Sequence, residues 1–288
     1  NIGWQAVGIA PIRNTHSGLV PVMGDGKYEW DGYLPISEKP NVYNPSKKFF
    51  ATANQNVTPA TYKHWNAIGF SWSDPYRGDR VNNVLSNASV DKFTMQDMMD
   101  LQVDYHSLPS EILIEMLSEV ALDSTMKPHF ERLLNWNNKL TKNSVEATIY
   151  VNFERAIIRE FYQKFVPEQV GGLLNIQLFK IIERLAKMND EKRNEFLKRA
   201  FFSSIKELES KLGYDVDDWS YGQENYKHIK IKHPRENVVN DSIYNLIGFK
   251  TYPRGGNTYT PGTSGSNLNQ SKGASFRVVI DTKDWDNS

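Results

Sequence analysis

The sequence contains no cysteine among its 288 residues. Disulfide bonds, thiolate metal sites and a cysteine nucleophile are therefore excluded for this chain. Neither sign of charge is in excess, because 34 lysines and arginines balance 34 aspartates and glutamates. A chain without net charge has no overall field to attract phosphate backbones or anionic lipids. We expect neither nucleic acid nor a membrane among its partners.

Several common motifs are also missing. No apolar run approaches the ~20 residues needed to cross a bilayer. There is no Gly-x-Ser-x-Gly elbow, no His-Glu-x-x-His helix and no phosphate-binding glycine loop. Of six scattered histidines, only His228 and His233 have a spacing suited to a metal, and we favour packing or capping beside Pro234 instead. Because the sequence starts at Asn1 without a leader and stops directly after a strand-like run, we expect it to be a piece of a longer protein.

The composition divides the chain into three parts within one predicted fragment, residues 1–288. Residues 1–75 are rich in turn-forming and aromatic residues, and the apolar runs Ile2–Ile9 and Phe49–Ala53 predict strands. Residues 76–213 are predicted to be helical. Residues 214–288 return to strands and loops, with a surface loop predicted over 255–273 and a strand over Ser275–Asp281.

The helical part shows apolar residues three and four positions apart, which is the pattern of helices with one buried face. It predicts helices from Tyr76 onward, after an N-cap at Thr94, and over Glu111–Leu122, Ser144–Phe165, Leu173–Met188 and Glu191–Leu212. Boundaries are indicated by Pro109, Pro128, Pro167, Gly171–Gly172 and Gly213. Strands near both ends with helices between them predict an α+β fold.

The most informative motifs lie in the first third of the chain. They are Trp30-Asp31-Gly32-Tyr33-Leu34-Pro35, Asn44-Pro45, Ala53-Asn54-Gln55-Asn56 and, further on, Arg80 at the start of a predicted helix. In this order they resemble the penicillin acylase family of N-terminal-nucleophile hydrolases, and the resemblance runs along the chain from Asn1 to Asp281. The resemblance implies an αββα fold and hydrolysis of a linear amide through an acyl-enzyme.

The same resemblance places the nucleophile outside this sequence. In the family, a serine exposed by self-cleavage at the β-subunit terminus attacks the amide, well before the segment that matches Asn1-Ile2-Gly3. Asn1 cannot replace it, because its amide is not a nucleophile of the Ser, Thr or Cys kind. The isolated chain is therefore expected to be inactive. The implied partners are a small-molecule amide substrate, the remainder of the β subunit and the α subunit, in the periplasm or outside the cell.

By the family match, Asn56 supplies a side-chain N–H to the oxyanion hole. Attack on an amide carbonyl places negative charge on oxygen, and loss of one fixed donor costs on the order of 2.7–4 kcal/mol. Arg80 matches the family arginine that supports the site through charge-assisted hydrogen bonds, and an ion pair with Asp74 or Asp79 is the alternative. Asn54 is either a further support or a residue that satisfies backbone groups at a turn.

Two further points stay open at the level of sequence. Some relatives bind a structural calcium ion, but Asp74 and Asp79 are the only acids between Asn56 and Arg80, and neither stands at the ligand position. We expect no cofactor, and calcium in the parent protein is left without support from this chain. The competing hypothesis is a non-catalytic module or degenerate relative that binds amide-like or glycan ligands through its tryptophan-rich loops, such as the one around Trp30.

Overall fold

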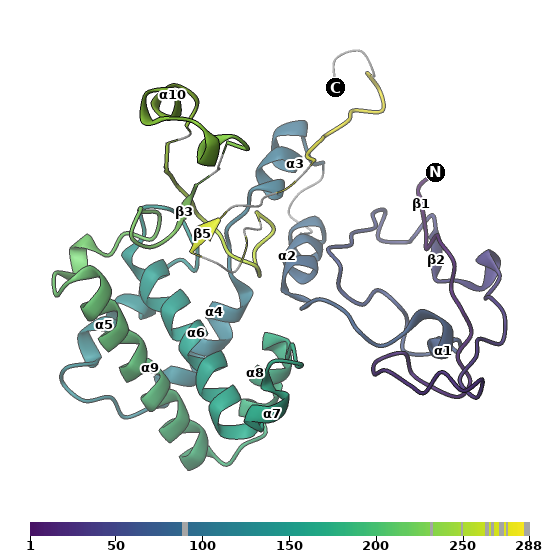
Figure 1. Ribbon diagram of the computed structural model, residues 1–288, viewed down its shortest axis with the longest axis horizontal. Coiled ribbons are helices and arrows are strands. Elements are labelled where there is room, and N and C mark those ends of the chain that lie inside the picture. Colours follow the sequence, from purple (N-terminus) through teal and green to yellow (C-terminus); the bar gives the residue numbers. More distant parts are fainter. Residues whose placement is uncertain are drawn as a thin grey trace. The chain divides into compact units, whose positions relative to one another are not determined.

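The computed structural model describes residues 1–87, 92–230, 233–248, 250–262, 265, 268–270, 274 and 276–284. The chain forms two compact units, residues 1–88 and 89–288. They are called unit 1 and unit 2, and Figure 1 labels their elements.

Unit 1 contains little regular structure. Strand β1 (Gly3–Gln5) pairs antiparallel with β2 (Asn41–Tyr43), with Trp4 opposite Val42. The remaining elements are a short 3-10 helix (Ile36–Glu38), α1 (Trp65–Ile68) and α2 (Tyr76–Leu85). Trp4 stacks on Phe50 with ring centroids 4.8 Å apart, which fixes the two-stranded ribbon against the chain that follows it. Loops, held by such contacts, form most of this unit.

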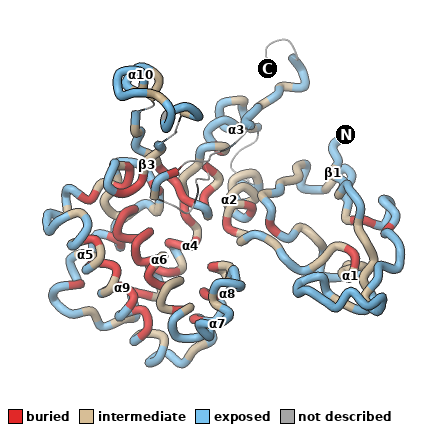
Figure 2. The backbone as a smooth tube through the Cα atoms, viewed as in Figure 1, coloured by how far each residue is buried: buried red, intermediate tan, exposed pale blue. Residues whose placement is uncertain are grey.

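Unit 2 is built around two long helices, α6 (Val145–Phe165) and α9 (Asp190–Leu212). The buried stretches in Figure 2 are concentrated on these helices, where Phe153 meets Phe201 edge to face at 5.3 Å. The helices of unit 2 that precede or connect them are α3 (Met95–Gln102), α4 (Leu108–Ser118), α5 (Lys127–Leu134), α7 (Glu168–Gly171) and α8 (Leu178–Ala186). No helix within the described residues has the length and apolarity that crossing a bilayer requires.

The end of unit 2 adds short elements to this helical core. They are a 3-10 helix (Val216–Asp218), β3 (His228–Ile229), a 3-10 helix (Glu236–Val238), α10 (Asp241–Ile247), β4 (Tyr252–Pro253) and β5 (Asn269–Gln270). The sheet order is β4-β3-β5, with β3 antiparallel to β4 and parallel to β5. Helices and short strands in one chain agree with the predicted α+β class.

A buried polar network joins this final part to α6. The Glu154 carboxylate is 3% exposed, accepts a hydrogen bond from the Tyr150 hydroxyl at 2.7 Å, and accepts a second from the Asn257 amide at 3.2 Å. The Tyr226 hydroxyl donates to the Thr148 carbonyl of the same helix at 3.4 Å. Buried polar groups are tolerated when they have such partners. The network therefore fixes the segment around Asn257 onto the middle of α6.

The predicted helix starts are confirmed where capping residues mark them. Thr94 forms a capping box with Asp97, whose carboxylate accepts from the Thr94 N–H at 2.8 Å. The Ser144 hydroxyl accepts from the Ala147 N–H at 3.0 Å at the start of α6. At the other end α6 stops at Phe165, two residues before Pro167, as expected from the inability of proline to continue a helix.

Two helix predictions were wrong in their bounds, and one helix was missed. The helix predicted over Glu111–Leu122 is α4, which begins at Leu108 and ends at Ser118, because Pro109 lies in its first turn and not at a boundary. The helix predicted over Leu173–Met188 begins only at Leu178, because the Tyr162 hydroxyl donates to the Leu174 carbonyl and accepts from the Ile176 N–H, which holds that stretch as a loop. Helix α5 was missed because Pro128 was interpreted as a boundary. Proline at the first turn starts a helix as readily as it ends one, and Pro128 occupies that turn.

The strand and loop predictions also needed correction. No strand forms over 276–281, and Ser275 lies outside the described residues. A strand needs a neighbour to pair with, whereas the side chains of Phe276 and Val278 are exposed. Of the runs Ile2–Ile9 and Phe49–Ala53, only Gly3–Gln5 is a strand.

The segment predicted as a surface loop over 255–273 is buried in its first described part. Asn257 is 5% exposed and Thr260 is fully buried. Any Cβ added at Gly255 would come within 2.7 Å of the Tyr105 ring. Glycine in this tract therefore reflects close packing of backbone against an aromatic ring, not freedom of the chain.

Candidate active site

The predicted asparagines share one tight turn in unit 1. Asn54 adopts the left-handed conformation with φ of 69°, which asparagine tolerates better than most residues. Its carbonyl accepts from the Ser73 N–H at 3.1 Å. Between the two exposed asparagines, the buried Gln55 turns its Oε1 back to the Ala53 N–H at 2.6 Å. The turn therefore presents Asn54 and Asn56 on its outside and is held by Gln55 from within.

The side-chain amides of both asparagines are anchored through their oxygens. The Asn56 Oδ1 accepts from the Thr58 N–H at 2.9 Å, and the Asn54 Oδ1 accepts from the Arg77 Nη2 at 2.8 Å. No hydrogen bond from either Nδ2 group to another residue in the described ranges is found. Each amide is thus fixed with its N–H donors available, which is what an oxyanion donor requires.

The first turn of α2 packs directly against this turn. A Cβ added at Gly78 would lie 2.2 Å from the Gln55 Cδ, so a larger residue would require the buried Gln55 side chain to move. Arg77, one residue earlier, reaches the Asn54 side chain. Its partial burial removes water from the guanidinium and lowers the pKa of Arg77.

The structure places Arg80 in the second turn of the same helix, where the residue is half-buried. Arg77 contacts the asparagine turn through a hydrogen bond, and it was not among the site residues predicted from the sequence. The signal that could have indicated Arg77 is the adjacent Gly78, because glycine inside a predicted helix often marks a close approach of two segments. The roles of Asn54, Asn56 and Arg80 in chemistry stay predictions.

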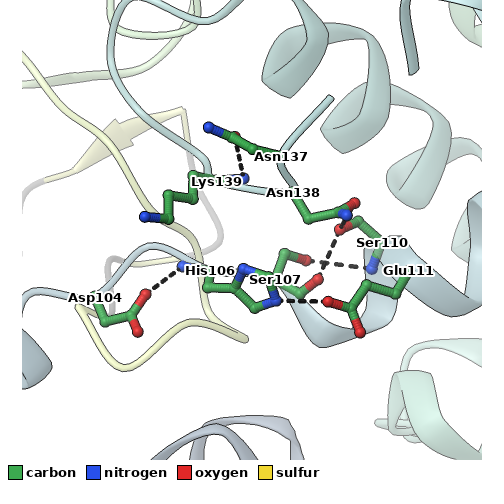
Figure 3. Close-up of polar contacts among 8 residues, drawn as sticks. All are labelled: Asp104, His106, Ser107, Ser110, Glu111, Asn137, Asn138 and Lys139. Carbon is green, nitrogen blue, oxygen red and sulfur yellow. Dashed lines mark hydrogen bonds and ion pairs between the residues drawn. The ribbon is translucent and has the colours of Figure 1, made fainter. Parts of the chain in front are cut away.

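A second polar cluster, at the start of α4, contains serine, histidine and glutamate side chains (Figure 3). The His106 Nε2 contacts the Glu111 Oε1 at 2.6 Å, so the imidazole faces a carboxylate. Ser107 is fully buried, and its hydroxyl caps the helix by accepting from the Ser110 N–H at 3.3 Å. The Ser110 hydroxyl donates to the Asn138 Oδ1 at 2.8 Å. With both serines engaged in capping and bracing, this cluster is a structural helix start.

The structure also describes the histidines and tryptophans that were weighed as alternative ligand sites. Within the described residues no group of three or more histidines and carboxylates is placed to hold a metal ion. The His233 Nδ1 accepts from the Arg235 N–H at 3.1 Å, which is a capping contact beside Pro234. Trp30 and Tyr33 are both more than half exposed and contact each other edge to face at 6.2 Å.

Comparison with known proteins identifies the family. The model of the penicillin amidase family matches residues 1–288. An acyl-homoserine lactone acylase QuiP from Pseudomonas fluorescens strain Pf0-1 is 24% identical over an alignment covering 98% of this chain and 37% of the relative. The Escherichia coli penicillin G acylase is 34% identical over 30% of this chain and 10% of its own length.

The fold comparison agrees with the sequence comparison. A thermostable penicillin G acylase from Alcaligenes faecalis superposes with a TM-score of 0.60 at 16% identity, covering 76% of this chain and 46% of that one. This chain therefore belongs to the penicillin amidase family. It spans about a third of the length of the curated relatives it matches, at 31% and 37% of two QuiP acylases.

Proposed function

We propose that this chain is part of an amide hydrolase that cleaves a linear amide through an acyl-serine intermediate. The observation that carries the proposal is the turn in which Asn54 and Asn56 are anchored through their oxygens with their N–H groups available. Membership of the penicillin amidase family, with relatives named penicillin acylase and acyl-homoserine lactone acylase, supports the reaction class.

The contribution of this chain is to stabilise charge. When a serine from the remainder of the protein attacks the amide carbonyl, the carbonyl oxygen becomes negative, and a fixed N–H stabilises that charge more than it stabilises the neutral substrate. We assign this donor to Asn56, with Arg80 as support and Asn54 as the second candidate. The substrate is a side-chain amide of a β-lactam or the amide of an acyl-homoserine lactone. The partners are the remainder of the β subunit and the α subunit, in the periplasm or outside the cell.

The test uses the full-length protein and measures single-turnover acylation with a chromogenic phenylacetyl amide. Asn56→Ala should slow acylation by roughly two to three orders of magnitude, because one oxyanion donor is lost. Asn66→Ala is the matched control. Its amide donates to the exposed Asn14 side chain at 2.8 Å, outside the turn, so its removal should leave the rate unchanged.

The outcomes separate the two asparagines. If Asn54→Ala slows acylation and Asn56→Ala does not, the donor lies two residues earlier in the same turn and the assignment of Asn56 is wrong. If neither substitution changes the rate in correctly matured protein, the turn is not an oxyanion donor. The isolated chain should show no turnover, and activity that depends on a residue within residues 1–288 alone would contradict the placement of the nucleophile outside it.

A further inference from the structure

We propose that Arg77 is a positioning residue that orients the oxyanion turn by holding the Asn54 side chain. The inference rests on the proposed function of that turn. The hydrogen bond from the Arg77 Nη2 to the Asn54 Oδ1 is 2.8 Å long and joins residues 23 positions apart. It connects the first turn of α2 to the asparagine turn, in addition to the hydrogen bond from the Ser73 N–H to the Asn54 carbonyl.

The charge of Arg77 makes this bond stronger than an ordinary one. Hydrogen bonds from a charged donor are roughly twice as strong as neutral ones. Arg77 forms no ion pair with a carboxylate in the described part of the chain, so its charge acts on the Asn54 amide. Polarising that carbonyl oxygen strengthens the N–H of Asn54, the second candidate donor, because linked hydrogen bonds reinforce one another.

The backbone of the turn is constrained as well as its side chain. Asn54 has a φ of 69°, a left-handed conformation that asparagine adopts more readily than most residues but that still costs more than an ordinary one. The Ser73 N–H holds the Asn54 carbonyl and Arg77 holds its side chain, so both groups of this residue are tied to the segment leading into α2. Loss of either tie should allow the turn to relax and Asn56 to move with it.

Helix α2 is itself braced against the chain before the turn, which makes it a suitable support. The Lys47 ammonium donates to the Asn82 Oδ1 at 3.0 Å, and the Asn82 amide donates to the Gly78 carbonyl at 2.7 Å. Lys47 also lies 4.5 Å from the centre of the Phe49 ring. These contacts fix the helix turn that carries Arg77, so the guanidinium is presented from a rigid element.

The test replaces Arg77 in the full-length protein. Arg77→Met should slow single-turnover acylation by roughly ten- to a hundredfold with little change in KM, because misplacing a catalytic group by about 1 Å costs up to that much. Arg77→Lys should recover part of the rate, since an ammonium can still donate to the Asn54 oxygen. Arg13→Met is the matched control, because Arg13 also reaches across unit 1, to the Ala67 carbonyl at 3.5 Å, without contacting the turn.

A double-mutant cycle shows whether Arg77 acts through Asn54. In the Asn54→Ala background, Arg77→Met should slow acylation by less than about threefold, because the group it orients is gone. Full additivity of the two losses would overturn the proposal. So would an unchanged rate for Arg77→Met when Asn54→Ala or Asn56→Ala slows the reaction. If all three variants keep the wild-type rate, it is the oxyanion assignment that has failed, and the positioning role falls with it.

Discussion

Replacing Gly78 by alanine tests the packing of α2 on the asparagine turn. The new Cβ would lie 2.2 Å from both the Cδ and the Nε2 of Gln55, whereas carbon atoms in contact normally stay about 3.5–4.0 Å apart. Gln55 is 8% exposed, so its amide must move by more than about 1 Å within a packed interior. That movement also removes the acceptor of the Ala53 N–H.

The expected magnitude follows from three contributions. Overpacking of an interior costs typically 1–3 kcal/mol, and a lost hydrogen bond costs about 1 kcal/mol. Alanine in place of a helical glycine returns up to about 1 kcal/mol. The net effect of Gly78→Ala is therefore a local destabilisation of about 1–3 kcal/mol. Helix propensity alone predicts the opposite sign, so the direction of the change decides between the two.

Hydrogen-exchange mass spectrometry is the suitable assay, because it reports on unit 1 and unit 2 separately. Peptides covering residues 50–60 should exchange roughly ten times faster in Gly78→Ala, while peptides from α6 and α9 stay unchanged. In a Gln55→Ala background the obstacle is absent, and Gly78→Ala should then be neutral or stabilising. Slower exchange of the turn in the single variant would refute the packing argument.

Two further predictions concern unit 2. Burial, followed by the positive charges of Arg254 and Arg155, lowers the pKa of Lys227 to about 8. An unfolded lysine titrates near 10.5, so the folded state loses its proton at a lower pH than the unfolded state. The unfolding free energy should therefore rise by about 1–2 kcal/mol from pH 8 to 9.5 relative to Lys227→Met. The same pH dependence of the unfolding free energy in both proteins would contradict this. Phe201→Ala should lower the unfolding free energy, measured by chemical denaturation, by about 3–5 kcal/mol. Phe202→Ala, at its exposed neighbour, should lower it by less than about 1 kcal/mol. Equal losses would show that α9 does not bury the face that carries Phe201.

Local signals in the sequence predicted the helices well and the loops poorly. Capping at Thr94 depends on neighbouring residues, so it was predicted from the sequence and is confirmed in the structure. The buried segment around Asn257 depends on a partner 103 positions away, Glu154, and no local pattern reports that distance. Composition alone therefore predicted a surface loop where the chain is packed.

The candidate site shows the same division. The motif Ala53-Asn54-Gln55-Asn56 indicated the turn, because the family pattern is written in consecutive residues. The contact from Arg77 to Asn54 was not predicted, since it depends on how α2 lies against the turn. Gly78, beside Arg77, indicates a close approach of two segments by its residue type. The sequence does not say which segment approaches, and the structure shows that it is the one with Gln55.

The network around Glu154 has a consequence for how unit 2 folds. Its bonds to Asn257 and the Tyr226–Thr148 bond span 103 and 78 residues, so α6 must wait for distant parts of the chain before its polar groups are satisfied. Contacts between residues so far apart in sequence slow folding, because long loops must close first. An intermediate with α6 packed on α9 but the last part detached would lack the hydrogen bond from Asn257 to the Glu154 carboxylate, at a cost of about 1.5–3 kcal/mol. Such an intermediate is disfavoured, and the final stretch of the chain should join unit 2 in the same cooperative step that forms its helical core.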